Sequence, residues 1–273
     1  MPYANTSELR IYYERHGSGC PVLFIGGVGG DLRGEPGVPE RELAQRFDLL
    51  TYDQRGTGQT DKPDSAYTMT DYARDAAALM DTVGWDSAHV VGVSFGGMVA
   101  QELVLQFPRY VRSLVLACTA SGGAGGSSYP LHELSDLSPD ERARKMLAIA
   151  DVRRNEAWQA SHPEETEQLL KQAAAAASPF LKEPGGIMGL TRQIGARSQH
   201  DTYDRLLQIR VPVLVCGGRY DGQASPDVVE NLYRRISNAE IRFFEGGHRF
   251  LNEDPEASKA VAEFLEQQCK TGE

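Results

Sequence analysis

Residues 92–96 read Gly92-Val93-Ser94-Phe95-Gly96, a G-x-S-x-G pattern between an apolar run over 89–93 and a helical pattern over 95–107. A serine on such a strand-to-helix turn has a strained backbone, so its neighbours must be small. The glycines of the pattern and Gly97 meet that requirement. The turn predicts that the Ser94 hydroxyl stands at the carboxyl end of a sheet, beside a helix N-terminus that favours negative charge. An ordinary turn with a capping serine fits the same pattern, so the partners of Ser94 must decide.

Outward from this turn, short apolar runs alternate with amphipathic segments, which is typical of a largely parallel sheet covered by helices. We therefore expect an α/β fold with a mostly parallel, twisted sheet, in which the first two strands form a pair. The expected strands are 9–15, 22–25, 47–52, 89–93, 113–118, 211–216 and 240–244, and the expected helices are 69–83, 95–107, 226–236 and 255–268.

The alternation of strands and helices stops between residues 120 and 200. This segment opens with a Gly/Ser-rich stretch, 121–128, and continues with helical patterns over 139–151, 163–177 and 187–197. About 80 residues are too many for a loop inside a compact domain. The sequence therefore predicts a core formed by 1–119 and 201–273, with a helical cap, 120–200, inserted into it.

A serine hydroxyl needs a base before it can attack a carbonyl group. Among six histidines, His248 is best placed, because it follows the predicted strand 240–244 and so lies at the same edge of the sheet as Ser94. His89 opens the strand that leads to Ser94, and we expect it at the opposite end. The other four lie on predicted surface or cap segments: His16, His132, His162 and His200.

The imidazole in turn needs an acid that orients it and stabilises its charge. Asp221 follows the predicted strand 211–216 and is the best candidate. The nearest rival, Asp227, is explained by its place in the first turn of the helix 226–236, where a negative charge favours the helix dipole. The order Ser94, Asp221, His248 is that of the α/β-hydrolases and differs from the protease orders.

With these motifs the chain resembles the α/β-hydrolase superfamily over nearly its whole length. Further matching motifs are the turn 53–58, Asp53-Gln54-Arg55-Gly56-Thr57-Gly58, and the stretch 217–221 that ends in Asp221. The resemblance is greatest to small bacterial esterases and lactonases, of the 3-oxoadipate enol-lactonase and aclacinomycin methylesterase types. It implies a capped α/β-hydrolase fold, and an oxyanion hole formed by the backbone N–H groups of Val28 and Phe95.

One departure from the family concerns the loop that carries Val28. Most members have His-Gly where this chain has Gly26-Gly27. Loss of the histidine side chain leaves the backbone N–H donors of the oxyanion hole in place, but the sequence does not show what anchors the loop. We expect Asp53 and Arg55 to act as a structural clamp near the site. Asp31 is expected as a solvated loop carboxylate, with a substrate contact as the alternative.

Apolar side chains of the cap could line a substrate pocket, above all Trp158, Met146 and Met188, although a core position inside the cap is the simpler interpretation. The expected function is a serine hydrolase of carboxylic esters or lactones that forms an acyl-enzyme on Ser94. The same triad would serve C–C bond hydrolysis or cofactor-free perhydrolysis. A slow ligand sensor and a purely structural binding module are the alternatives outside catalysis.

Composition limits the partners of this 273-residue chain. Its net charge of −10 argues against nucleic acid and anionic lipid, which need clustered positive charge. No apolar stretch approaches a membrane span, and the first residues do not resemble a signal peptide. Glycine patterns for nucleotide cofactors are incomplete, and no metal or cofactor is expected.

The four cysteines, Cys20, Cys118, Cys216 and Cys269, lie far apart, so we expect no zinc site, no disulfide framework and a cytoplasmic location. Nothing in the sequence indicates an oligomeric state.

Overall fold

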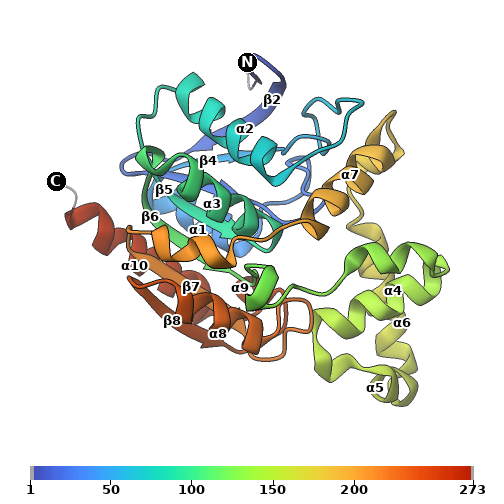
Figure 1. Cartoon of the computed structure of the whole chain (residues 1–273). Helices are drawn as coiled ribbons and strands as arrows, with labels where there is room; N and C mark the ends of the chain where they lie inside the picture. Colours follow the sequence, from blue (N-terminus) through green and yellow to red (C-terminus); the bar gives the residue numbers. More distant parts are fainter. Residues whose placement is uncertain (1–2, 272–273) are drawn as a thin grey trace.

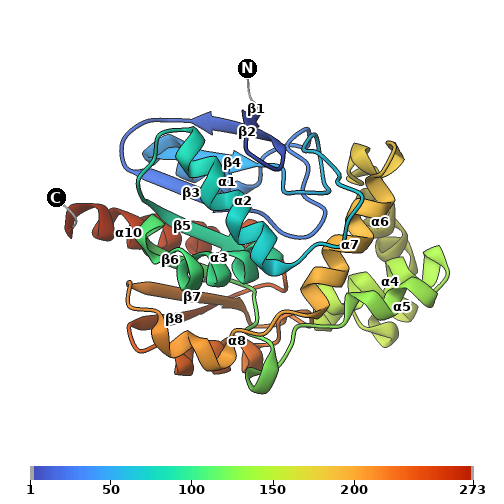
Figure 2. The same ribbon diagram turned by 45° about the horizontal axis from the view of Figure 1, so that its top comes forward.

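The computed structural model describes residues 3–271, and its strands form one sheet. Their order is β1-β2-β4-β3-β5-β6-β7-β8, and β2 alone runs antiparallel to its neighbours (Figures 1 and 2). This confirms the expected mostly parallel sheet. The strands are β1 (Tyr3–Asn5), β2 (Arg10–His16), β3 (Pro21–Ile25), β4 (Asp48–Tyr52), β5 (Ala88–Val93), β6 (Val111–Ala117), β7 (Val213–Gly218) and β8 (Ala239–Phe244).

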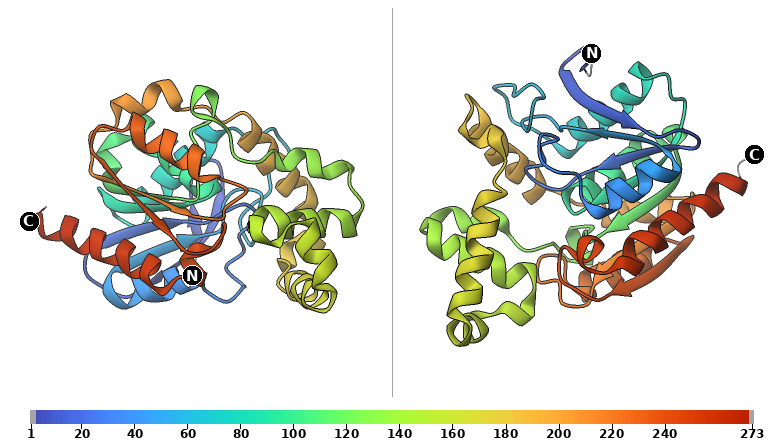
Figure 3. Two further views of the ribbon diagram at one scale, coloured as in Figure 1. Left: turned by 90° about the horizontal axis from the view of Figure 1, so that it is seen from below. Right: turned by 180° about the vertical axis from the view of Figure 1, so that it is seen from behind.

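Helices cover both faces of the sheet because its inner strands are apolar on both sides. Leu23, Val90 and Leu114, on three adjacent strands, are fully buried. One face carries α1 (Val38–Arg46) and α10 (Pro255–Thr271), which contact each other (Figure 3). The other face carries α2 (Met69–Thr82), α3 (Phe95–Gln106) and α8 (Pro226–Arg235). Both faces of the central strands are thereby shielded from water, which stabilises the sheet.

The sheet and its helices differ in several details from the sequence-based expectation. The first two predicted strands, β2 and β3, are not paired, because β4 lies between them. The strand β1 and the helix α1 were not predicted. In α1 only Pro39 and Leu43 are buried, so its apolar periodicity is too weak to be recognised.

All the regular secondary structure between β6 and β7 is helical. Helices α4, α5 and α6 stand as a group to one side of the sheet, apart from the helices that cover its faces (Figures 1 and 2). That the cap comprises residues 120–200 stays a prediction. The helices are α4 (Pro139–Ala150), α5 (Glu156–Ser161), α6 (Pro163–Ala175) and α7 (Gly186–Ser198); α9 (Phe250–Glu253) follows β8, and short 3₁₀ helices occupy Pro108–Tyr110, Gly123–Gly125, Leu131–Asp136, Val152–Arg154, Pro179–Lys182 and Tyr203–Gln208.

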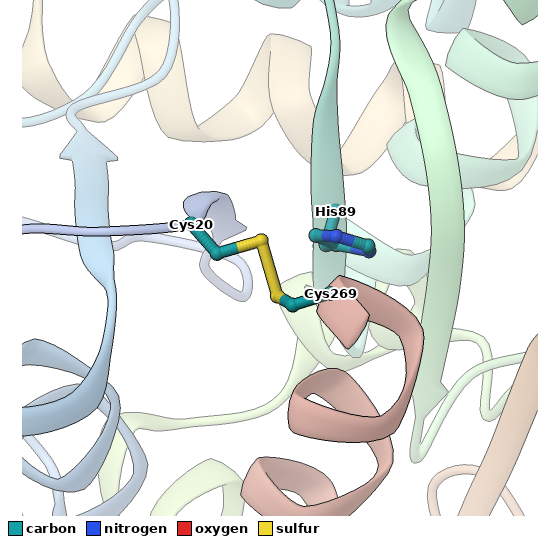
Figure 4. A group of neighbouring side chains, drawn as sticks. All are labelled: Cys20, His89 and Cys269. Atoms are coloured by element: carbon teal, nitrogen blue, oxygen red, sulfur yellow. A yellow bond between two sulfur atoms is a disulfide. The ribbon is translucent and has the colours of Figure 1, made fainter. Parts of the chain in front are cut away.

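A disulfide between Cys20 and Cys269 contradicts the expectation that the cysteines stay unpaired (Figure 4). Cys20 immediately precedes β3 and Cys269 lies near the end of α10, so the pair is 249 residues apart in the sequence. Only the packing of α10 against the sheet brings them together. His89 of β5 lies beside the sulfurs, and its Nδ1 is 2.8 Å from the Ser113 hydroxyl. Burial lowers the pKa of His89 to about 4, so its ring is neutral.

We expect this disulfide to stabilise the fold measurably. Closing so long a loop restricts the unfolded chain, and loss of such a bond typically costs about 2–5 kcal/mol, or roughly 5–15 °C in Tm for a chain of this size. Dithiothreitol should therefore lower the Tm of the wild type by that amount, as measured by calorimetry. The Cys20→Ser/Cys269→Ser variant should melt at the lower temperature with or without reductant. An unchanged Tm of the reduced wild type, with all four thiols titrated, would contradict this expectation.

Within residues 3–271 no helix combines the length and the apolar character that a bilayer crossing requires.

Candidate active site

Three side chains meet at the carboxyl edge of the parallel strands. Ser94 follows β5, Asp221 follows β7 and His248 follows β8. The His248 Nε2 lies 2.9 Å from the Ser94 Oγ, and the His248 Nδ1 lies 2.8 Å from Oδ2 of Asp221. The structure thus joins the three residues singled out in the sequence into one hydrogen-bonded chain from hydroxyl to ring to carboxylate.

The turn at Ser94 has the strained backbone that the G-x-S-x-G pattern predicts. Ser94 has φ 56° and ψ −115°, and its side chain makes no capping hydrogen bond to α3, unlike an ordinary N-cap serine. A Cβ on Gly96 would lie 1.9 Å from the Ile25 carbonyl oxygen, and one on Gly92 would lie 2.5 Å from the Gly96 oxygen. Only glycine fits at these positions. The Ser94 backbone N–H donates to the Ala117 oxygen at 2.8 Å, which anchors the turn to β6.

Asp221 is held so that one carboxylate oxygen faces the histidine. The residue is 2% exposed. Its Oδ1 accepts hydrogen bonds from the backbone N–H groups of Gln223 and Ala224, at 2.7 and 3.0 Å, which leaves Oδ2 for His248. The rival carboxylate, Asp227, is exposed in the first turn of α8.

His248 is positioned by the helical segment between β6 and β7, called the inserted segment below, as well as by the sheet. Its backbone N–H donates to the carbonyl oxygen of Ala150, the last residue of α4, at 2.7 Å. A Cβ on the preceding Gly247 would lie 2.0 Å from that same oxygen, so the close approach requires glycine there. The helices between β6 and β7 therefore help to hold His248 in line with Ser94.

The loop that carries Val28 is anchored by hydrogen bonds to side chains from distant parts of the chain. The Gly29 N–H donates to Oε1 of Gln193 at 2.8 Å, and the Ser178 hydroxyl donates to the Gly29 oxygen at 2.9 Å. The Gln54 side chain donates to the Gly26 oxygen at 2.9 Å. Gln193 and Ser178 belong to the inserted segment, so contacts across the fold hold this loop in place.

The two expected oxyanion donors are unengaged. Phe95 is the first residue of α3, so its N–H has no acceptor within the helix. Neither its N–H nor that of Val28 donates to any other group in the described part of the chain. A Cβ on Gly27 would lie 3.7 Å from the Ser94 Cβ, which places the loop directly against the serine.

Polar residues below this loop form the expected clamp. Asp53 accepts backbone hydrogen bonds from Leu32 and Gln59, both at 2.7 Å, and so joins two loops; burial raises its pKa to about 6. Arg55 forms a bidentate ion pair with Asp75, at 2.6 and 2.7 Å.

The expectation of a solvated Asp31 is wrong. Its side chain is 2% exposed and is bound by Arg33, because the loop folds back against the inserted segment, where the Phe180 N–H also contacts Asp31 at 3.3 Å.

Comparison with known proteins assigns the chain to a family. Residues 21–255 match the sequence profile of the alpha/beta hydrolase fold. The chain belongs to the α/β-hydrolase family. Among curated relatives of this α/β-hydrolase, the putative carbamate hydrolase RutD of Azorhizobium caulinodans is 29% identical over 268 residues, with 94% of each chain covered.

Solved structures share the fold over almost the full length. The enol-lactonase of Burkholderia xenovorans superposes with a TM-score of 0.76 at 23% identity, covering 97% of this chain and 99% of that one. A meta-cleavage product hydrolase of Pseudomonas fluorescens also has a TM-score of 0.76, at 21% identity and 97% coverage of both chains. At these identities the likeness concerns the fold of the α/β-hydrolase alone.

The three side chains expected to line a substrate pocket are spread over the inserted segment. Trp158 of α5 is half-buried and stacks on His162, with 4.7 Å between the ring centroids. Met146 lies on α4, one turn before the residue that holds His248, and Met188 lies on α7 near Gly185. Their contact with a substrate stays a prediction.

Two residues near the site of this α/β-hydrolase carry no signal in the sequence. The Cys118 thiol lies within 4.8 Å of Asp221 and His248 ligand atoms, and burial raises its pKa, so it stays protonated. His200 is the last residue of the predicted cap and is only 6% exposed; together with Met98 of α3 it lines a cavity. Burial lowers the pKa of His200 to about 4.

Two clusters of metal-ligating side chains occur among residues 3–271. In the group of Cys118, Asp221 and His248, both ring nitrogens of the histidine are engaged by Asp221 and Ser94. In the group of Cys20, His89 and Cys269, the two sulfurs are bonded to each other. The histidine of the first cluster and the two sulfurs of the second therefore already have partners within the chain.

Proposed function

We propose that this α/β-hydrolase cleaves a carboxylic ester or lactone through an acyl-enzyme on Ser94. The observation that carries the proposal is the chain of hydrogen bonds Ser94–His248–Asp221, at 2.9 and 2.8 Å. As Oγ attacks the carbonyl carbon, Nε2 of His248 accepts its proton. The Asp221 carboxylate accepts the Nδ1–H, which fixes the tautomer and stabilises the imidazolium that forms.

The negative charge of the tetrahedral intermediate needs donors aimed at the former carbonyl oxygen. The free N–H groups of Val28 and Phe95 are the proposed donors, since they flank Ser94 and make no other hydrogen bond among the described residues. Losing one such donor typically lowers the rate by about 10²- to 10³-fold. The anchors of the loop, Gln193 and Ser178, support a preformed hole.

Collapse of the intermediate breaks the bond to the alcohol. His248 returns its proton to the leaving oxygen, and the acyl group stays on Ser94. A water molecule then attacks the acyl-enzyme, with His248 again as the base, and releases the acid. In a lactone the leaving alcohol stays attached to the acyl group, so the same two steps open the ring.

C–C bond hydrolysis on the same triad is the second candidate, since one of the solved structures that share this fold is a meta-cleavage product hydrolase. Haloalkane dehalogenase and epoxide hydrolase chemistry is disfavoured, because there the nucleophile of the turn is an aspartate and here it is Ser94. Cofactor-free perhydrolysis and slow ligand sensing are the remaining alternatives on the same scaffold.

Active-site titration tests the proposal. A fluorophosphonate should label one serine per chain, and the labelled peptide should contain Ser94. A panel of short-chain esters, lactones and dienoic ketones should then yield turnover on at least one ester or lactone. Turnover of the ketones alone would favour the C–C hydrolase. Turnover near background, together with ligand-dependent stabilisation, would favour the sensor, and absence of labelling would overturn the proposed mechanism.

The expected kind of substrate and the expected cellular location are supported to different degrees. A net charge of −10 supports a small-molecule substrate over nucleic acid or an anionic membrane. A cytoplasmic location has weaker support, because reducing compartments keep most thiols unpaired and this fold carries the Cys20–Cys269 disulfide.

A further inference from the structure

A cavity of about 230 Å³ lies between the start of α3, the segment after β6 and the end of α7. Met98 of α3, one helical turn beyond Ser94, forms part of its wall. Most of the other side chains that line the cavity are polar, and none of the lining residues is acidic. The polar side chains used below are Ser127, Ser128, His132, Arg197 and His200.

Arg197 in this cavity is a buried cation without a counter-ion. It is 6% exposed, and its only hydrogen-bond partner in the described part of the chain is the Ser128 hydroxyl, at 2.6 Å. Burial alone lowers the pKa of Arg197 to about 10, so the side chain remains charged at neutral pH. Arg55, which is equally buried at 5%, is paired with Asp75. An uncompensated buried charge is costly, and such groups are normally paired.

His200 adds a second unsatisfied polar group to the same wall. The residue is 6% exposed, and neither ring nitrogen makes a hydrogen bond of good geometry within residues 3–271, although the backbone of Ala120 lies close enough to interact with the ring. Since the ring is neutral, one nitrogen carries a hydrogen that can be donated. Ser127 and His132 also line the cavity and are exposed, so solvent and small molecules can reach it.

The helix that carries Arg197 also reaches the loop beside Ser94. Gln193, one turn earlier on α7, accepts the Gly29 N–H with its Oε1, while its buried Nε2 has no partner among the described residues. Residues four apart lie on one helix face, about 6 Å from each other. The same face of α7 therefore runs from the Val28 loop to the cavity, and Met98, in the cavity wall, lies one helical turn beyond Ser94 on α3.

We propose that this cavity is a carboxylate-binding subsite, in which Arg197 and His200 bind a free carboxylate of the substrate. A planar guanidinium matches a carboxylate with two parallel hydrogen bonds, and the ligand would supply the missing counter-ion. The inference rests on the proposed function, because it adds a requirement for a negatively charged group to the ester or lactone that Ser94 attacks.

Matched pairs of esters test the proposal kinetically. The monomethyl and dimethyl esters of succinate, glutarate and adipate differ within each pair by one carboxylate, and the series varies its distance from the scissile bond. Wild type should prefer the monomethyl ester of at least one pair. Arg197→Met should lower the monomethyl-to-dimethyl ratio of kcat/KM by about 10- to 100-fold, as expected for loss of a hydrogen-bonded charge partner. Arg197→Lys should recover part of that ratio.

Arg234→Met is the matched control, since that arginine is 66% exposed on α8. It should leave the ratio unchanged. The readout also separates ligand binding from a structural role: Arg197→Met removes an uncompensated charge, so its Tm should not fall below that of the wild type without ligand. A structural role predicts a lower Tm and equal losses on both members of each pair.

A binding experiment keeps this proposal separate from the hydrolase mechanism. Ser94→Ala protein is titrated calorimetrically with glutarate, and the titration is repeated with Arg197→Met added. Binding that needs Arg197, together with the kinetic effect, identifies the carboxylate as the substrate's own. Binding that needs Arg197 without the kinetic effect identifies a separate small acid as the ligand and overturns the substrate assignment.

The two proposals can also fail separately. No turnover of any ester, with Arg197-dependent binding intact, overturns the proposed function and leaves the carboxylate site standing. Absence of glutarate binding together with an unchanged ratio in Arg197→Met overturns the carboxylate site.

Discussion

Ser94→Ala is expected to lower kcat on activated esters by about 10⁴- to 10⁶-fold, because removal of the nucleophile of a triad leaves only binding and the oxyanion donors. Oγ is the only atom lost, and it is the atom that faces Nε2 of His248 at 2.9 Å. The substitution keeps the small side chain that the strained turn at φ 56° already accommodates. Stopped-flow and steady-state assays with p-nitrophenyl acetate give the comparison.

The control for this variant is Ser135→Ala, an exposed serine of the inserted segment. It should retain full activity, and both variants should keep the wild-type circular dichroism spectrum and Tm. Loss of fluorophosphonate labelling only in Ser94→Ala completes the argument. If Ser94→Ala kept more than a tenth of the wild-type kcat, the acyl-enzyme mechanism on this residue would be wrong.

Asp221→Asn is expected to lower kcat by about 10⁴-fold with an unchanged fold. The Asp221 Oδ1 is occupied by two backbone N–H groups, so the amide of the variant would place its NH₂ group at the Oδ2 position. That group donates a hydrogen bond, and Nδ1 of His248 would have to accept it. The ring would then carry its hydrogen on Nε2 and could not take the proton of Ser94.

Asp227→Asn provides the matched comparison, since it makes the same chemical change six residues later on the exposed first turn of α8. Its kcat should equal that of the wild type. A rise in KM without a fall in kcat for Asp221→Asn would contradict the orienting role and indicate a binding role instead. A fall in Tm of more than a few degrees would show that the loss of activity reflects damage to the fold.

The local pattern of the sequence was sufficient to predict that the three residues near the strand ends lie close together. Ser94 directly follows its strand, Asp221 and His248 lie within four residues of the ends of theirs, and parallel strands all end at the same edge of the sheet. Position in the sequence therefore implied proximity in space. The strained turn could be predicted for the same local reason, because glycines flank the serine within two positions on each side.

Contacts between distant segments could not be predicted in this way. The loop at Val28 is anchored by Gln193 of α7 and by Ser178, which precedes a 3₁₀ helix; they lie 164 and 149 residues beyond the Gly29 that they contact. The placement of β4 between the first two predicted strands is of the same kind, since adjacency in a sheet is not encoded by the periodicity of either strand.

By itself the sequence determined the fold class and the identity of the hydroxyl, ring and carboxylate, because these follow from residue type and from spacing along single strands and turns. Tertiary structure alone decided that Cys20 meets Cys269, that His200 is buried and that Arg197 has no counter-ion among the described residues. Pairing and burial depend on which surfaces pack together, and that choice is made by the whole chain at once.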